Sequence, residues 1–149
     1  QIFERWAAKN IYGQVGGAER FTAKTTKLAE DYKAANPSFK GESITSDTVI
    51  KDSARSGEAG IGDFKSHFNR KNIGTEADAL RQADNYKEML RVGVKTATGE
   101  KFTWVEYLFA NRTSAEASYK FLKNKFGDTV KVFFVDEKGA KTLFVPAGP

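Results

Sequence analysis

The segment KFTWVEYLFAN constrains the fold of this chain more than any other. Apolar side chains occupy nearly every position from 102 to 110. The side chains of a strand point alternately to its two faces, so a strand that is apolar on both faces has to be covered on both. The segment therefore predicts the central strand of a sheet that is packed between other elements.

The first half of the chain predicts a helix followed by a hairpin. Apolar residues recur at helical spacing from 16 to 35, where the dipeptide NP ends the segment, and residues 2–10 allow a shorter helix before it. Two stretches of strand character, 44–51 and 61–68, flank the polar turn DSARSGEAG. Strands joined by such a turn are expected to pair as a hairpin.

Two further helices are predicted from their termini. Thr75 is placed to cap a helix that runs to about Arg91, with acidic residues in its first turn. Thr113 and Glu116 form the capping box TSAE ahead of another helix, and Gly127 sits at its expected end. Each helix therefore has a defined start in the sequence.

The C-terminal part adds two strands and completes the fold class. The stretches TVKVFFVDE and KTLFVP indicate strands that meet at a KG turn. The order is then helix, strand hairpin, helix, strand, helix, strand, without a repeat or a linker. We expect an α/β sandwich with a mixed central sheet, in a single domain that spans residues 1–149.

Composition excludes several kinds of functional site. The 149 residues include no cysteine and one histidine, which excludes disulfides, thiolate nucleophiles and zinc sites built from Cys or several His. A bound metal would be a hard cation with oxygen ligands, such as Mg²⁺ or Mn²⁺. The 24 Lys and Arg against 19 Asp and Glu leave a net charge of +5, which mildly favours a polyanionic partner.

The chain lacks the marks of a membrane protein. No apolar run approaches the ~20 residues that cross a bilayer, so we expect a soluble chain with no membrane span. The N-terminal QIFERWAAKN is charged and does not resemble a signal peptide. The missing initiator methionine predicts a fragment cut from a longer polypeptide.

Charged residues share one face of the second hairpin strand, where valine or isoleucine would be the default. Strand alternation places Asp63, Lys65 and His67 on one face and sends Phe64 and Phe68 to the other. The phenylalanines are candidates for the core. The charged face is therefore a candidate for function.

Asp47 extends this charged face across the hairpin. It stands between Ser46 and Thr48 on the preceding strand, so we expect it to approach Asp63 within the distance that one metal ion bridges. Neighbouring carboxylates repel unless a divalent cation lies between them. Such an ion polarises a phosphate and lowers the pKa of a bound water, and Lys65 could orient that water. The pattern predicts hydrolysis of a phosphodiester.

Asp47 and the later GDFK, followed by a helix, resemble the PD-(D/E)xK nuclease superfamily over roughly residues 16–135. The resemblance implies the restriction-endonuclease-like core αβββαβαβ. It also implies that Asp47 is the first metal-binding acid, Asp63 the second and Lys65 the catalytic lysine. The chain departs from the pattern in having Ser46 where proline is usual, and Asp in place of the commoner Glu before x-Lys.

The same resemblance implies further site residues. Many members add a metal-binding acid from the first helix, which Glu19 matches and for which Glu30 is a rival on the same helical face. Several carry a Gln and an aromatic residue on the helix after the lysine, which Gln82 and Tyr86 match one turn apart. The candidate contacts to nucleic acid are Arg70, Lys71 and Tyr86.

A small, basic, cysteine-free fragment with this motif is also similar in type to the C-terminal nuclease toxins of bacterial polymorphic toxin and contact-dependent growth inhibition systems. That similarity implies a fragment released from a larger exported protein, which acts on tRNA or DNA in the cytoplasm of a target cell. It also implies a cognate immunity protein. The substrate expectation leans slightly toward tRNA or other RNA.

Three alternatives stay open from the sequence. Asp63 and Lys65 could form a solvated ion pair on an exposed strand, worth well under ~1 kcal/mol. The chain could be a non-catalytic module that binds nucleic acid or protein on a nuclease-like scaffold. His67 could be the general base of a metal-independent ribonuclease.

Overall fold

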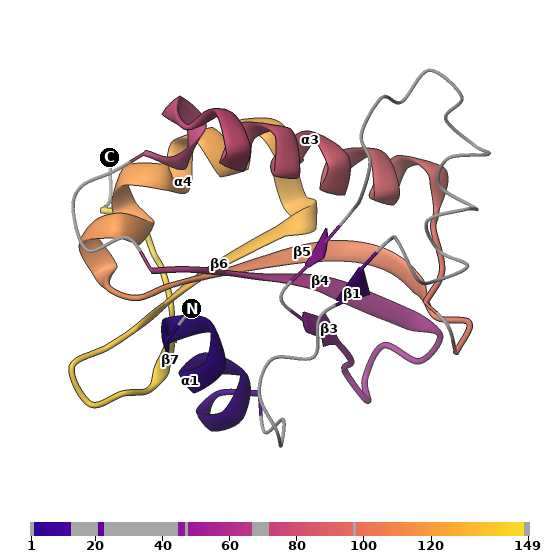
Figure 1. Ribbon diagram of the computed structural model, residues 1–149, viewed down its shortest axis with the longest axis horizontal. Helices are drawn as coiled ribbons and strands as arrows, with labels where there is room; N and C mark the ends of the chain where they lie inside the picture. The colour runs from indigo at the N-terminus through magenta and orange to yellow at the C-terminus, as the bar shows by residue number, and fades with distance from the viewer. Residues whose placement is uncertain are drawn as a thin grey trace.

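A mixed five-stranded sheet runs through the computed structural model of the chain (Figure 1). The structure describes residues 2–12, 21–22, 45–46, 48–66, 72–96 and 98–147. The strands are, in spatial order, β3 (Thr48–Ile50), β4 (Glu58–Lys65), β5 (Lys101–Phe109), β6 (Val130–Val135) and β7 (Lys141–Leu143). β4, β5 and β6 are parallel, whereas β3 and β7 pair antiparallel with their neighbours. The predicted α/β sandwich, both hairpins and the central place of β5 are confirmed.

Helices cover both faces of this sheet (Figure 1). α3 (Ala77–Val92) and α4 (Arg112–Phe126) connect the parallel strands, which cannot be joined by tight turns, and they lie together on one face. α1 (Ile2–Asn10) lies on the opposite face, which confirms the short N-terminal helix. Single turns of 3₁₀ helix, η1 (Ile73–Thr75) and η2 (Gly127–Thr129), adjoin α3 and α4. No helix among the described residues is long and apolar enough to cross a membrane.

A small second sheet corrects two predictions. β1 (Phe21–Thr22) pairs antiparallel with β2 (Thr45–Ser46), so the continuous helix predicted over 16–35 is wrong at these two residues. The rest of that predicted helix lies outside the described residues, and the core order αβββαβαβ therefore stays a prediction. The strand predicted over 44–51 is divided between two sheets, because β2 pairs with β1 whereas β3 pairs with β4.

β5 is buried on both faces, as its sequence predicts. Val105, Tyr107 and Phe109 join the main core under α3 and α4, whereas Leu108 joins a smaller core with Phe64 under α1. The alternation shifts once near the start of the strand, because Ala59 pairs with Phe102 but the next residue of β4 pairs with Trp104.

The helix termini differ from the predicted caps. Asn111, rather than Thr113, caps α4, because its side-chain oxygen accepts a hydrogen bond from Ser114 N at 2.9 Å. The Thr75 hydroxyl donates to the Asn72 carbonyl within η1 and does not cap α3. Gly127 ends α4 with a φ of 61°, as predicted, because glycine tolerates this backbone conformation.

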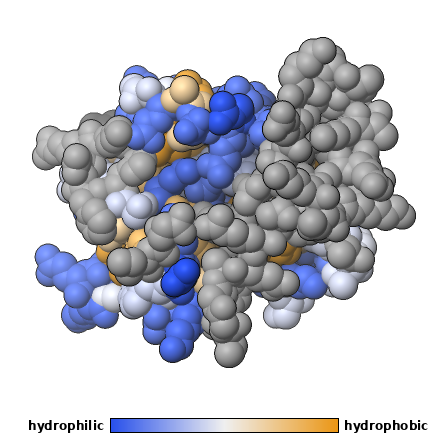
Figure 2. Space-filling view, viewed as in Figure 1, coloured by the Kyte–Doolittle hydropathy of each residue, from blue (hydrophilic) through white to orange (hydrophobic). Residues whose placement is uncertain are grey.

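The side of the α3 and α4 layer that Figure 2 shows is mostly hydrophilic, with a few hydrophobic side chains among the polar ones. Ion pairs along α3 link Arg81 to Asp78 and Arg91 to Glu88, one turn apart in each case. Exposed pairs of this kind contribute little to stability. The stability of this layer therefore depends on its inner face, where Ala83, Tyr86 and Met89 are buried, rather than on its charged exterior.

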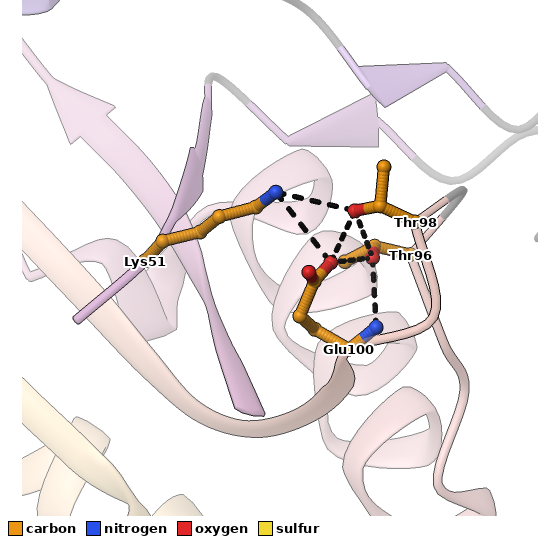
Figure 3. A network of polar contacts seen from close by, with 4 residues as sticks. All are labelled: Lys51, Thr96, Thr98 and Glu100. Carbon is orange, nitrogen blue, oxygen red and sulfur yellow. Dashed lines mark hydrogen bonds and ion pairs between the residues drawn. The ribbon is translucent and has the colours of Figure 1, made fainter. Parts of the chain in front are cut away.

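A polar network ties the end of β3 to the loop before β5 (Figure 3). Glu100 accepts hydrogen bonds from the Thr96 and Thr98 hydroxyls, and its backbone N–H donates to Thr96 Oγ1 at 3.1 Å. Lys51 Nζ lies 3.5 Å from Glu100 Oε1 and donates to Thr98 Oγ1 at 3.2 Å. The hydrogen bonds from Thr96 and Thr98, helped by the Lys51 charge, lower the pKa of Glu100 from 4.5 to about 2.

We predict that this network makes stability sensitive to acid. Because the folded-state pKa of Glu100 is depressed, its contribution is present above pH 4.5 and is lost as the pH falls toward about 2. Glu100→Gln should flatten the dependence of the free energy of unfolding on pH in this window, measured by urea denaturation at several pH values. Glu116→Gln on the exposed side of α4 is the control. An unchanged pH slope in Glu100→Gln would contradict the prediction.

We predict that Gly60 is required by the indole ring of Trp104. A Cβ atom on Gly60 would lie 2.3 Å from Trp104 Cε2, and the ring cannot move away freely because it is only 2% exposed. Gly60→Ala should lower the free energy of unfolding by about 1–3 kcal/mol through overpacking. Adding Trp104→Leu removes the ring, so Gly60→Ala should then cost less. An equal cost in both backgrounds would disprove the clash.

Candidate active site

Asp63 lies on β4 near the carboxyl end of the strand and is only 1% exposed. Its neighbours in the strand alternate as expected, because Ile61 belongs to the main core while Phe64 packs in the smaller core under α1. Removing a carboxylate from water costs several kcal/mol unless hydrogen bonds or charges compensate it. The alternative of a solvated ion pair on an exposed strand is therefore wrong.

Tyr86 supplies one of the compensating contacts from α3. Its hydroxyl donates to Asp63 Oδ2 at 2.7 Å, and its side chain is fully buried. The resemblance implied that Tyr86 contacts nucleic acid, but this burial directs its hydroxyl to the carboxylate instead. Tyr86 therefore holds Asp63 in place.

Lys65 supplies the second contact and links Asp63 to Gln82. Its Nζ lies 3.0 Å from Asp63 Oδ1 and donates to Gln82 Oε1 at 2.7 Å. The Lys65 side chain is 14% exposed, so it is mostly buried but still has some access to solvent. Gln82 and Tyr86 are one helical turn apart on α3, which places both on the face that covers β4.

The structure thus joins four of the predicted site residues into one chain of polar contacts. It runs from Tyr86 through Asp63 and Lys65 to Gln82. Lys65 is the last residue of β4, which runs parallel to β5 and β6. Ligands of open α/β sheets bind outside the carboxyl ends of their strands. The polar cluster therefore lies at the edge of the sheet where a ligand site is expected.

The other predicted site residues lie outside the described part of the chain. They are Glu19, Glu30, Asp47, His67, Arg70 and Lys71. Among the described residues, no three His, Cys, Asp or Glu side chains gather into a metal site. The predicted metal set, which requires Asp47 and Glu19, stays a prediction.

Asp63 itself suits a hard cation. Its Oδ1 is buried and receives no hydrogen bond among the described residues, although Lys65 Nζ lies at ion-pair distance. A carboxylate oxygen with spare acceptor capacity is a good ligand for Mg²⁺ or Mn²⁺. The chemistry of this one donor therefore fits the predicted cation.

Tyr107 is a member of this neighbourhood that sequence reasoning missed. It pairs in register with Asp63 across β4 and β5 and is fully buried. Burial, reinforced by the Asp63 charge, raises the pKa of Tyr107 well above its ordinary value, so the phenol stays protonated. Its place in an apolar run made it look like a core residue, and only the strand pairing places it beside Asp63.

Glu106 is a second buried carboxylate that sequence reasoning missed. It lies on β5, is 4% exposed, and accepts hydrogen bonds from Tyr12 OH and Lys141 Nζ, both at 2.5 Å. Burial and the Glu106 charge raise the pKa of Tyr12, which therefore remains a donor. Because both partners converge on one oxygen, this cluster joins the end of α1 to β7 and is a structural tie between them.

Comparison with protein-family models, curated proteins and solved structures found no match to this chain. The function therefore has to be inferred from the chemistry of the site. The contacts among Asp63, Lys65, Gln82 and Tyr86 are the part of that chemistry that the described residues contain.

We predict that Tyr86→Phe destabilises the fold by about 1–3 kcal/mol, because it leaves Asp63 Oδ2 buried without its donor. The free energy of unfolding from urea denaturation measures the loss. Tyr119→Phe is the matched control, since Tyr119 is half-buried on α4 and packs its ring against Phe144. Equal stability of the two variants would show that the Tyr86 hydroxyl does not support Asp63.

Proposed function

We propose that the protein is a metal-dependent endonuclease that hydrolyses phosphodiester bonds in nucleic acid. The observation that carries the proposal is the contact of Asp63 and Lys65, which share one strand of an α/β sheet, with Gln82 and Tyr86 of the next helix. The Asp-x-Lys motif predicts the chemistry, and both residues stand near the carboxyl end of their strand, where ligands of such sheets bind.

The site residues would have two roles, which are to bind the metal ion and to orient the attacking water. Asp63, with Asp47 and Glu19, would hold Mg²⁺ or Mn²⁺, and the ion would polarise the phosphate and lower the pKa of a bound water. Lys65 would orient the attacking water or offset the charge that develops on the phosphate. Gln82 supports this role, because its carbonyl oxygen holds the ammonium at 2.7 Å.

The proposal extends to the substrate, the partner and the place of action. The excess of basic residues, +5 overall, suits a polyanionic substrate, and the similarity in type to bacterial nuclease toxins favours tRNA or other RNA over DNA. An immunity protein that blocks the site would present an acidic surface to it. The fragment would be released from a larger exported bacterial protein and act in the cytoplasm of a target cell, with Arg70 and Lys71 as contacts to nucleic acid.

We predict that Asp63→Asn and Lys65→Met each reduce cleavage at least ~100-fold, because each removes a group that acts in the transition state. Purified protein is incubated with total tRNA and, separately, with plasmid DNA, each with Mg²⁺ and with EDTA. Circular dichroism checks that both variants fold. Asp128→Asn and Lys138→Met are the matched controls, since both residues are exposed on other segments. Full activity of both site variants would disprove the proposal.

The same assay separates the two alternative functions. A non-catalytic module would retain nucleic acid in a mobility-shift assay without any metal-dependent loss of substrate. A metal-independent ribonuclease with His67 as its base would cleave RNA equally well in EDTA. The metal-dependent enzyme loses activity in EDTA and regains it when Mg²⁺ is added back.

A further inference from the structure

Asp63 has two tyrosine neighbours that come from different elements. Tyr86 reaches it from α3, whereas Tyr107 is its register partner on the neighbouring strand β5. The two tyrosine rings meet edge to face, with centroids 6.3 Å apart. Both side chains therefore border the buried carboxylate.

The two tyrosines differ in what their hydroxyls do. The Tyr86 hydroxyl donates to Asp63 Oδ2, whereas the Tyr107 hydroxyl is buried without a hydrogen-bond partner anywhere among the described residues. The second carboxylate oxygen, Asp63 Oδ1, also receives no hydrogen bond there, and its contact is the ion pair with Lys65. A buried donor and a buried acceptor thus lie on paired residues without bonding to each other.

The Tyr107 hydroxyl, unpaired among the described residues, destabilises the resting site. A second state of the site, in which the hydroxyl is bonded, would explain why a tyrosine stands at this position. A buried hydroxyl without a partner lowers the stability of the fold, and phenylalanine at the same position would avoid that loss. The positive charge of Lys65 compensates Oδ1 only while the ammonium stays at Asp63. If Lys65 turns toward a phosphate or a water, Oδ1 loses this ion pair, and a cation bound to Oδ1 would use one of its lone pairs and leave the other for a donor.

We propose that Tyr107 is a positioning residue that donates a hydrogen bond to Asp63 Oδ1 when Lys65 leaves the carboxylate to act on the substrate. The motion of Lys65 in this inference rests on the proposed function. The pairing of Tyr107 with Asp63 is observed in the sheet and does not depend on that function. The high pKa of Tyr107 suits the role, because the phenol remains a donor at neutral pH.

A double-mutant cycle tests the pairing without any assay of activity. Lys65→Met removes the ammonium and so mimics its departure, and Tyr107→Phe removes the hydroxyl. Tyr107→Phe alone should leave the urea midpoint unchanged or higher, because the hydroxyl has no partner in the resting site. In the Lys65→Met background the same change should lower the midpoint. Equal effects in the two backgrounds overturn the proposal.

Kinetics of the intact enzyme give the second test. Tyr107→Phe should lower kcat about tenfold while KM changes little, since the hydrogen bond forms only after Lys65 engages the substrate. An unchanged kcat in Tyr107→Phe overturns the proposal. A fall in the stability of Tyr107→Phe equal to that of Tyr86→Phe also overturns it, because the Tyr107 hydroxyl would then have a purely structural role. If the wild-type protein cleaves neither RNA nor DNA, the proposed function fails, and the double-mutant cycle still decides the role of Tyr107.

Discussion

The burial of β5 on both faces is the constraint on which the rest of the structure depends. A strand that is apolar toward both sides needs a layer above and a layer below it, and here α3 with α4 and the shorter α1 provide them. Because β4, β5 and β6 are parallel, their connections have to cross over, and α3 and α4 make those crossings. The same geometry packs the first crossing helix, α3, against the sheet, where Tyr86 reaches Asp63 and Gln82 reaches Lys65.

Two carboxylates are buried in this sheet, on opposite faces, and they are compensated in different ways. Both partners of Glu106 donate to one of its oxygens, which suits a tie between α1 and β7. Asp63 has a donor on Oδ2, whereas its Oδ1 receives no hydrogen bond among the described residues and faces Lys65 Nζ as an ion pair. A carboxylate oxygen that receives no hydrogen bond keeps its acceptor capacity for a new ligand. This contrast is the physical reason to place chemistry at Asp63 rather than at Glu106.

Local patterns predicted most of the described elements, and non-local contacts account for the misses. The period-two pattern found the strands and both hairpins, and helical spacing found α3 and α4 with nearly correct ends. The predicted cap of α4 was wrong because Asn111 and Thr113 both have side chains that suit a cap. The helix begins at Arg112, so Asn111 stands at the N-cap position. Phe21 was assigned to a helix from its local spacing, but a partner distant in the sequence, Ser46, holds it in a strand.

For the site, the sequence by itself determined the chemical groups and their local spacing. The alternation of β4 puts Asp63 and Lys65 on one face, and the helical repeat of α3 does the same for Gln82 and Tyr86. Only the tertiary structure decided that these two faces meet, that Asp63 is buried rather than solvated, and that Tyr107 stands beside it. The physical reason is that spacing along one element follows from backbone geometry. The packing of β4 against α3 and β5 follows from how the whole chain buries its apolar surface.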